Sequence, residues 1–388
     1  MKDHTGCARG ARVMISRIEL LKKVDALLGR LVASLLPIPR VTPPIADPQS
    51  LLIIRPGGIG DAVLLIPALI ALRERYPGAT ITILAERRNA AIFQLCPAVD
   101  GILLYDRPGE LITALRGRYD LVIDTEQWHR LSAVVARLAS APLKIGYATN
   151  ERSRLFTHPV TYSHDDYEAR SFFRLLEPLG LVSPDTVPVP FLSLPVVACE
   201  QAAELLAPLA GRDYLVIFPG ASIPQRRWGA QRFEELARRL EQEGWKVVVV
   251  GGETDVSDAR LIAGTTGLNL AGRSSLAGTA AVIAGASLLI SGDSGLLHMA
   301  VGLGTPTLSL FGPGRQKKWG PRGGGDSVIN HLLPCSPCTT FGSTPECPYQ
   351  VRCMEEITPE ELFQAAQRLL GEKKPRSRNK ILDINGGT

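Results

Sequence analysis

Residues 287–313 read SLLISGDSGLLHMAVGLGTPTLSLFGP. The stretch begins and ends with short apolar runs, residues 287–291 and 307–311, which enclose a Gly-Asp-Ser-Gly turn and an apolar segment of helical length. Two continuous apolar runs joined by a helix are typical of parallel strands that are covered on both faces. The stretch therefore predicts a strand–helix–strand unit of an α/β sheet.

The same alternation extends along the chain in both directions. Apolar runs at residues 51–54, 80–84, 102–105 and 120–124 alternate with helical stretches such as 61–76 and 128–139. The rhythm fades over residues 145–210. It resumes with runs at 214–218 and 246–250, helices near 230–243, 255–265 and 274–285, and a last helix at about 358–371. We therefore expect two doubly wound, Rossmann-like lobes facing a cleft, with ligands beyond the carboxyl ends of the strands.

Length and composition agree with two globular lobes. The chain has 388 residues, of which 45% are hydrophobic and 21% charged, as is ordinary for a folded protein of two domains. We expect an N-terminal extension at 1–48, a first lobe at 49–200, a second lobe at 201–371 and a disordered tail at 372–388. The net charge of +5 favours an anionic partner without deciding its chemistry.

The chain carries no uninterrupted apolar run of about 20 residues, so nothing in it is expected to span a bilayer. Its first fifteen residues carry scattered charges and no apolar run, unlike a cleavable signal peptide. We therefore expect a cytoplasmic location.

An amphipathic helix is predicted at residues 16–36. Ser16 followed by Glu19 forms a capping-box pattern, leucines and valines recur at helical spacing, and Lys22, Lys23 and Arg30 lie between them. Such a helix packs either on the protein's own surface or a partner subunit, or in the plane of a membrane with its lysines on anionic lipid. A proline-rich linker at 37–48 follows, and the sequence leaves both interpretations open.

A glycine loop follows the first apolar run of the first lobe. Gly58 and Gly60 let backbone approach a ligand closely, and with Glu86 they suggest a dinucleotide-binding fingerprint. Val63 stands where that fingerprint needs a third glycine, and Asp61 stands where a pyrophosphate would bind. Asp61 is instead a candidate general base for an acceptor hydroxyl. The alternative is an N-cap that only satisfies backbone donors.

Three loops of the second lobe are candidates for anion binding. After residue 218, a Gly-Ala-Ser turn and two adjacent arginines can offer N–H groups, a hydroxyl and a guanidinium to a diphosphate. After residue 250, Glu253 can hold ribose hydroxyls or merely start a helix. After residue 291, an N-cap cluster suits a phosphate, with His298 one turn beyond Ser294 on the same face. The candidates are Gly220, Ala221, Ser222, Arg226, Glu253, Asp293, Ser294, Gly295 and His298.

These motifs resemble those of the family-9 glycosyltransferases, whose best-known members are ADP-heptose:lipopolysaccharide heptosyltransferases. The matching stretches are Gly60-Asp61, residues 219–228, and Asp293-Ser294-Gly295-x-x-His298 with the Gly-Thr-Pro-Thr and Phe-Gly-Pro runs that follow, spread over residues 50–315. The resemblance implies a GT-B fold in which the N-terminal lobe binds the acceptor and the C-terminal lobe the nucleotide-sugar. It also implies inverting transfer without metal or cofactor.

The resemblance also implies roles for single residues. Asp61 would be the base, and Arg226, where relatives commonly have lysine, would steady the departing diphosphate. Glu253 would bind ribose and Asp293 would lie beside the sugar or phosphate, whereas Phe218 replaces a frequent histidine. The implied donor is ADP-heptose, and the acceptor a lipopolysaccharide core or another lipid-linked glycan. This implies work at the inner face of the cytoplasmic membrane and no nucleic-acid partner.

Alternatives from the sequence are a family-9-like transferase that uses another nucleotide-sugar, a nicotinamide-dependent oxidoreductase, and a non-catalytic binding protein. A separate feature is a group of four cysteines near the C-terminus, with a spacing that fits a structural zinc site. A metal-free loop and disulfides are the other interpretations. The four are Cys335, Cys338, Cys347 and Cys353.

Overall fold

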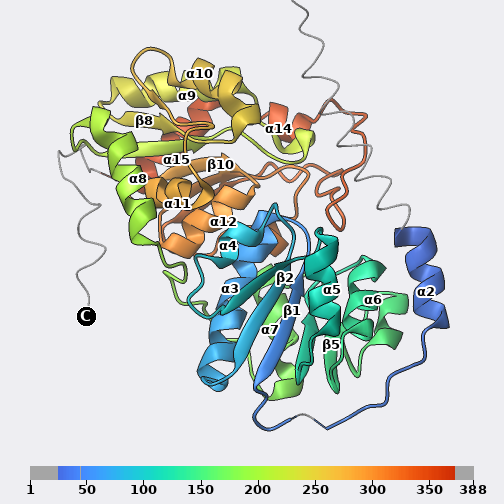
Figure 1. Ribbon diagram of the computed structural model, residues 1–388. Coiled ribbons are helices and arrows are strands. Elements are labelled where there is room, and N and C mark those ends of the chain that lie inside the picture. The colour runs from blue at the N-terminus through green and yellow to red at the C-terminus, as the bar shows by residue number, and fades with distance from the viewer. Residues whose placement is uncertain (1–24, 44, 372–388) are drawn as a thin grey trace, which may run out of the picture.

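The computed structural model describes residues 25–43 and 45–371 as two α/β lobes, one above the other in Figure 1. The predictions for residues 16–24 and for the tail at 372–388 lie outside the described residues. The predicted two-lobed fold is confirmed.

The first lobe is a six-stranded sheet of order β3-β2-β1-β4-β5-β6, with every pair parallel. Its strands are β1 (Ser50–Arg55), β2 (Thr80–Ala85), β3 (Gly101–Leu104), β4 (Leu121–Asp124), β5 (Leu143–Tyr147) and β6 (His158–Val160). The crossovers use α3 (Ile59–Arg75), α4 (Ala90–Phe93), α5 (Pro108–Arg116) and α6 (Arg130–Leu138), and α7 (Glu168–Arg174) packs against α3. The apolar run of β1 is buried on both faces, as its continuous pattern predicts.

The second lobe repeats the arrangement, with order β12-β11-β10-β7-β8-β9 and parallel pairs. Its strands are β7 (Tyr214–Phe218), β8 (Lys246–Val249), β9 (Leu268–Asn269), β10 (Leu289–Gly292), β11 (Thr307–Leu310) and β12 (Asp326–Ile329). Its helices are α8 (Val196–Leu206), α9 (Ala230–Gln242), α10 (Val256–Ala263), α11 (Leu276–Ala284), α12 (Gly295–Leu303), α13 (Gln316–Trp319), α14 (Arg352–Glu355) and α15 (Pro359–Leu370). Helix α8 packs on α11 of the same lobe. The domain boundary expected at residue 200 falls inside α8.

The strand order of each sheet reverses at one point, between β1 and β4 in the first lobe and between β7 and β10 in the second. In open parallel sheets the crevice beyond the carboxyl ends of the strands at this point is where ligands bind. The loops that the sequence singled out follow β1, β7 and β10, so both lobes bring their candidate loops to a reversal point.

The lobes meet where α3 packs against α12, and one hydrophobic core joins residues of both helices. Two glycines permit the close approach. A Cβ on Gly295 would lie 2.7 Å from Cγ2 of Ile59, and a Cβ on Gly60 would lie 2.6 Å from Cδ2 of His298. The N-termini of the two helices therefore lie against each other between the sheets.

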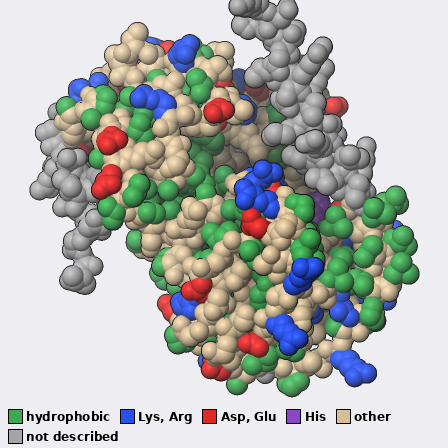
Figure 2. Space-filling model, viewed as in Figure 1, with side chains coloured by type: hydrophobic (Ala, Val, Ile, Leu, Met, Phe, Trp, Pro, Cys, Tyr) green, Lys and Arg blue, Asp and Glu red, His purple; other side chains and the backbone are tan. Residues whose placement is uncertain are grey.

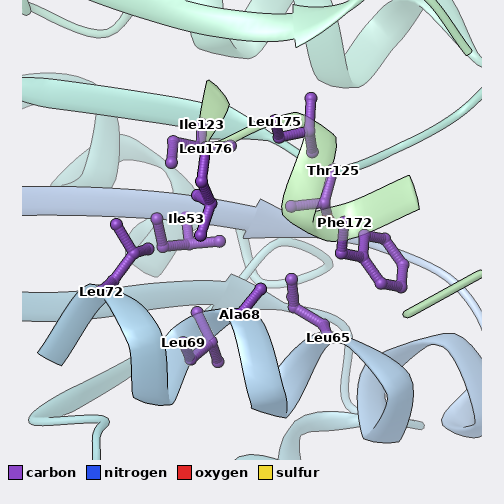
Figure 3. Close-up of a pocket in the computed structure, with 10 residues that line it drawn as sticks. All are labelled: Ile53, Leu65, Ala68, Leu69, Leu72, Ile123, Thr125, Phe172, Leu175 and Leu176. Atoms are coloured by element: carbon purple, nitrogen blue, oxygen red, sulfur yellow. The ribbon is translucent and has the colours of Figure 1, made fainter. Parts of the chain in front are cut away.

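A small pocket in the first lobe lies between β1, β4, α3 and α7 (Figure 3). Thr125 is the only polar residue among those that line it, and the apolar residues around it, such as Phe172 and Leu69, are buried. An apolar gap of this kind offers nothing to orient a polar ligand. We therefore treat it as a packing feature of the core and not as a site.

The described part of the predicted N-terminal helix is helical, with a π-helical turn at Asp25–Gly29 followed by α2 (Arg30–Leu35). Asp25 is buried, and its Oδ1 accepts a hydrogen bond of 2.8 Å from the backbone N–H of Leu131 at the start of α6. The leucines of this segment face away from the lobe: Leu27, Leu28, Leu31 and Leu35 are exposed. Figure 2 shows hydrophobic side chains gathered at this edge. None of the helices in the described ranges could cross a membrane.

Candidate active site

Asp61 lies in the first turn of α3, just beyond the carboxyl end of β1. Two groups hold its carboxylate. Nη2 of Arg55 lies 3.5 Å from Oδ2, and the indole N–H of Trp319, from the second lobe, donates a hydrogen bond of 3.2 Å to Oδ1. Gly58 is the N-cap of the helix and has no side chain with which to cap it. Both lobes therefore orient the carboxylate of Asp61.

Arg55 is a site residue to which the sequence assigned no role. Its guanidinium is buried, donates to the carbonyl of Thr125 at 2.8 Å, and lies 3.6 Å from Glu126. Burial alone would lower the pKa of Arg55, but Asp61 and Glu126 outweigh it and raise that pKa. Burial would likewise raise the pKa of Glu126, and Arg55 is the foremost of the cations that lower it. The sequence feature that could have identified Arg55 is its position at the end of a strand, directly before the glycine loop.

Arg226 and Asp293 form an ion pair at the reversal point of the second lobe. Nη1 of Arg226 lies 2.8 Å from Oδ2 of Asp293, and both side chains are largely buried. The neighbouring Arg227 points elsewhere, with Nε donating to the carbonyl of Ala221 at 3.2 Å and Nη2 3.6 Å from Asp255. One of the two adjacent arginines therefore lies beside the Asp293 loop.

His298 lies on α12, buried against Gly60 of the first lobe. Burial lowers the pKa of its imidazole to about 4, with Arg226 adding to the decrease and Asp293 opposing it. The ring is therefore neutral at physiological pH. The ring lies between the lobes, and its role in lining the site stays a prediction.

Several buried polar atoms of this region make no hydrogen bond among the described residues. They include Nε of Arg226, Oδ2 of Asp293 and Nδ1 of His298. Oδ2 of Asp293 does contact Arg226, in an ion pair rather than in a directed hydrogen bond. Buried polar groups are nearly always satisfied, so these atoms are available to hydrogen-bond with a polar ligand or with water.

The remaining predicted donor residues lie on the loops around this cluster. Ser294 caps α12, with its Oγ accepting from the N–H of Leu297 at 3.3 Å and lying 2.9 Å from Oγ of Ser291. Ala221 is buried and Ser222 is exposed. A Cβ on Gly220 would clash with Phe218 and Asp255, so this turn needs glycine.

The acid loop after β8 holds two carboxylates with different surroundings. Asp255 is buried and its Oδ2 accepts from the N–H of Gly252 at 3.0 Å. Glu253 is exposed at the start of the same turn. The carboxylate of Asp255 therefore stabilises its own loop. The exposed carboxylate of Glu253 stays a candidate for binding a ligand.

A second contact between the lobes lies beside Asp61. Lys318 is fully buried, and its Nζ lies 2.8 Å from Glu168 of the first lobe. The same ammonium donates to the carbonyl of Ser163 at 2.7 Å and to Oγ of Ser171 at 2.8 Å. Because Trp319 follows Lys318 directly, this anchor fixes the indole that binds Asp61. Neither contact was predicted from the sequence.

The cysteine-rich segment lies in the second lobe, after β12 and reaching into α14, which contains Cys353. All four of its cysteines are free thiols. Within the part of the chain that the structure describes, no group of three or more His, Cys, Asp or Glu side chains is placed to hold a metal ion. The structure therefore gives the predicted zinc site no support.

Comparison with known proteins agrees with the sequence motifs. The chain is 29% identical over 314 residues to lipopolysaccharide heptosyltransferase 1 of Pseudomonas aeruginosa, covering 74% of this chain and 85% of that protein. It is also 29% identical over 291 residues to lipopolysaccharide heptosyltransferase 3 of Escherichia coli K12, covering 68% and 82% respectively.

Solved structures show the same fold. ADP-heptose lipopolysaccharide heptosyltransferase II of E. coli superposes with a TM-score of 0.69 at 22% identity, over 83% of this chain and 98% of that one. The E. coli heptosyltransferase WaaC with ADP-2-deoxy-2-fluoro heptose gives a TM-score of 0.64 at 20% identity, over 82% and 99%. These neighbours confirm the predicted GT-B architecture. The sequence model of glycosyltransferase family 9 (heptosyltransferase) matches residues 109–347, more than half of the chain. The chain is therefore a glycosyltransferase and belongs to glycosyltransferase family 9.

Proposed function

We propose that this enzyme transfers heptose from ADP-heptose to a lipopolysaccharide core or a related glycan, with inversion at the anomeric carbon and without a catalytic metal. The names of the relatives support the donor and acceptor classes. Family membership argues against the oxidoreductase alternative. A family-9 transferase that uses another nucleotide-sugar is the remaining alternative.

The observation that carries the proposal is the meeting of two half-sites. Asp61 stands at the start of α3, and one residue before it Gly60 touches His298. His298 belongs to the second lobe, as do Arg226 and Asp293, and each of these three side chains has a buried polar atom that makes no hydrogen bond. A base from one lobe thus faces an anion-binding cluster from the other, as a displacement reaction requires.

The chemistry is a single displacement. Asp61 takes the proton of an acceptor hydroxyl as that oxygen attacks the anomeric carbon. The bond from that carbon to the diphosphate oxygen breaks, and the negative charge stays on the departing ADP. Arg226 and the N-terminus of α12 stabilise that charge. Attack from the face opposite the leaving group inverts the configuration.

The other donor-side residues have binding roles in this proposal. Backbone N–H groups of the Gly220–Ala221–Ser222 turn and of Ser294 and Gly295 would meet the diphosphate, because helix starts and tight turns favour anions. Exposed Glu253 would accept hydrogen bonds from ribose hydroxyls. The glycine loop at Gly58 and Gly60 would form the wall on the acceptor side.

Replacing Asp61 tests the reaction. We expect Asp61→Asn to lower kcat by about 100- to 10,000-fold, the usual contribution of a general base, with ADP-heptose still raising Tm as in the wild type. Asp185→Asn, at an exposed carboxylate, should leave transfer unchanged. Transfer by Asp61→Asn at the wild-type rate would refute the assignment.

The donor is tested separately with a panel of nucleotide-sugars. We expect ADP-heptose to raise Tm more than ADP-glucose, GDP-mannose or UDP-glucose at equal concentration, because a ligand stabilises the folded state according to its affinity. A larger shift and faster transfer with another sugar would replace heptose in the proposal. The anomeric configuration of the product, measured by NMR, tests inversion.

The leucines of the N-terminal helix support a second proposal, that this edge lies on an anionic membrane. Leu27, Leu31 and Leu35 recur on one helical face and are exposed, and the exposed Arg30 and Arg40 flank them. An exposed apolar strip edged by cations suits the interface of an anionic bilayer. A lipid-linked acceptor would bring the enzyme to such a surface.

Sedimentation with vesicles tests the membrane contact. We expect binding to vesicles of phosphatidylglycerol and phosphatidylcholine, weaker binding to phosphatidylcholine alone, and loss of binding in Leu31→Glu/Leu35→Glu. Val197→Glu, at an equally exposed apolar residue of the second lobe, is the matched control. Equal binding by both variants would exclude this surface.

A further inference from the structure

Four aromatic rings from the two lobes gather at one place. Trp128 follows β4, Tyr162 and His164 follow β6, and Phe341 comes from the cysteine-rich segment of the second lobe. Phe341 stacks on Trp128, with ring centroids 4.3 Å apart and planes inclined by 22°. It also meets His164 edge-on at 4.5 Å and lies 6.0 Å from the ring of Tyr162.

This aromatic cluster adjoins the proposed base. Its first-lobe members follow β4 and β6, which are parallel to β1, so they lie at the same edge of the sheet as Asp61. Nζ of Lys318 lies 4.2 Å from the ring centroid of Tyr162, and the next residue, Trp319, binds Asp61. Trp128, Tyr162 and His164 therefore belong to the lobe proposed to bind the acceptor, at the edge of the sheet where Asp61 stands.

Phe341 lies in a turn whose backbone conformation is unfavourable for phenylalanine. The backbone groups of Thr340 and Ser343 exchange two hydrogen bonds of 2.9 Å, so Phe341 and Gly342 are the central residues of a two-residue turn. Both have positive φ, 46° and 68°. Such turns favour Asn, Asp and Gly at both positions. A bulky ring in this position indicates that its contacts across the lobes, and not its backbone preference, hold it there.

The base of the loop belongs to the second lobe. The N–H groups of Cys338 and Thr339 donate to the carbonyl of Pro313 at 3.1 and 2.9 Å, and Nε of Arg315 donates to the carbonyl of Thr339 at 3.2 Å. The stem is thus fixed, and the tip alone reaches Trp128.

We infer that Trp128 is the platform on which a pyranose ring of the glycan acceptor stacks, and that Phe341 occupies this place when no acceptor is bound. A pyranose presents a face of C–H groups that an aromatic ring covers, and Trp128 is 36% exposed. Two rings stacked at 4.3 Å leave no room for a sugar between them. The acceptor must therefore displace Phe341. This inference rests on the proposed transfer to a glycan.

Calorimetric binding of a deacylated inner-core oligosaccharide of lipopolysaccharide to the full chain, without donor, tests the inference. We expect Phe341→Ala to tighten binding by about 3- to 10-fold, since it removes one aromatic pair that competes with the sugar. Trp128→Leu should weaken binding by about tenfold or more, and Trp128→Phe should restore most of it. ADP-heptose should bind all these variants equally.

Two matched controls separate this role from a general effect. Tyr349→Ala removes an exposed ring from the same segment, and Leu138→Ala removes an exposed apolar side chain of the first lobe; neither should alter the Kd for the oligosaccharide. Weaker or unchanged binding by Phe341→Ala, or a wild type that does not bind the oligosaccharide, overturns the inference. If the expected pattern appears and no heptose is transferred, the acceptor platform stands and the proposed donor is wrong.

Discussion

The indole N–H of Trp319 and the carboxylate of Asp61 are joined across the two lobes by a hydrogen bond of 3.2 Å, although the residues are 258 positions apart in the sequence. Asp61 Oδ2 meanwhile faces Arg55 at 3.5 Å. One of the two groups that orient the proposed base therefore comes from the second lobe, which couples the position of the lobes to the chemistry.

Removing this hydrogen bond should slow the reaction without weakening substrate binding. For Trp319→Phe we expect kcat to fall about tenfold. This corresponds to the lower end of the free energies of hydrogen bonds to charged groups, because Asp61 is partly exposed. KM for donor and acceptor should stay within about twofold. Steady-state kinetics with both substrates check this. An unchanged kcat would mean that Arg55 alone orients the carboxylate.

The two glycines of the acceptor-side loop should differ sharply in tolerance. A Cβ on Gly60 would lie 2.6 Å from the ring of His298, whereas a Cβ on Gly58 would meet nothing within 4 Å. We expect Gly60→Ala to destabilise the protein by about 1–3 kcal/mol, as overpacking does, and to reduce transfer because the lobes are forced apart.

Gly58→Ala is the matched control, since Gly58 has an ordinary φ of −75°. Denaturant unfolding and a transfer assay compare the two variants. Equal effects would show that contact with His298 does not limit the approach of the lobes.

Particular residues show how far the sequence predicts this protein. The runs at β1 and β10 identify buried parallel strands because they are short and continuously apolar, as strands covered on both faces are. β6 is only three residues, His158–Val160, and half exposed, so no periodicity marks it. Asp61, Asp293 and His298 belong to local motifs and were predicted.

The partners that complete the site were not predictable in the same way. Trp319 and Lys318 bind residues of the other lobe. Hydrophobic periodicity predicts which face of a helix or strand is buried, but it does not predict which residues cover that face. The ion pair between Arg226 and Asp293 depends on the neighbourhood of β7 and β10, which are adjacent in the sheet but not in sequence. Contacts between residues so far apart in the sequence can be identified only from the structure.

The buried histidine should make the protein sensitive to acid. The pKa of His298 falls to about 4 in the folded protein, from an ordinary 6.5. The unfolded chain therefore binds a proton between these values that the folded chain does not. The stability that this difference provides is complete above pH 6.5 and is lost as pH falls to 4, by about 3 kcal/mol in total.

Replacing His298 by Asn removes the titrating group. We expect the free energy of unfolding of His298→Asn to fall less steeply than that of the wild type between pH 6.5 and 4. Denaturant titrations at closely spaced pH values measure both. Parallel curves for His298→Asn and the wild type would count against a buried neutral ring.

A buried ion pair joins the two lobes. Lys318 and Glu168 are both fully buried, 2.8 Å apart, and Gln127 and Tyr162 also hydrogen-bond to Glu168. Lys318→Met leaves that carboxylate buried without its cation. We expect a loss of about 3–5 kcal/mol in the free energy of unfolding. Because Trp319 moves with Lys318, kcat should fall as well.

Glu168→Gln in the Lys318→Met background should recover part of the lost stability, since no unpaired charge then remains buried while the amide keeps hydrogen-bonding partners. Arg107→Met, which breaks an exposed pair with Glu110, is the control and should change stability by less than about 1 kcal/mol. If the double variant were as unstable as Lys318→Met alone, the loss would come from packing of the lysine stem. The interface would then depend on shape rather than on charge.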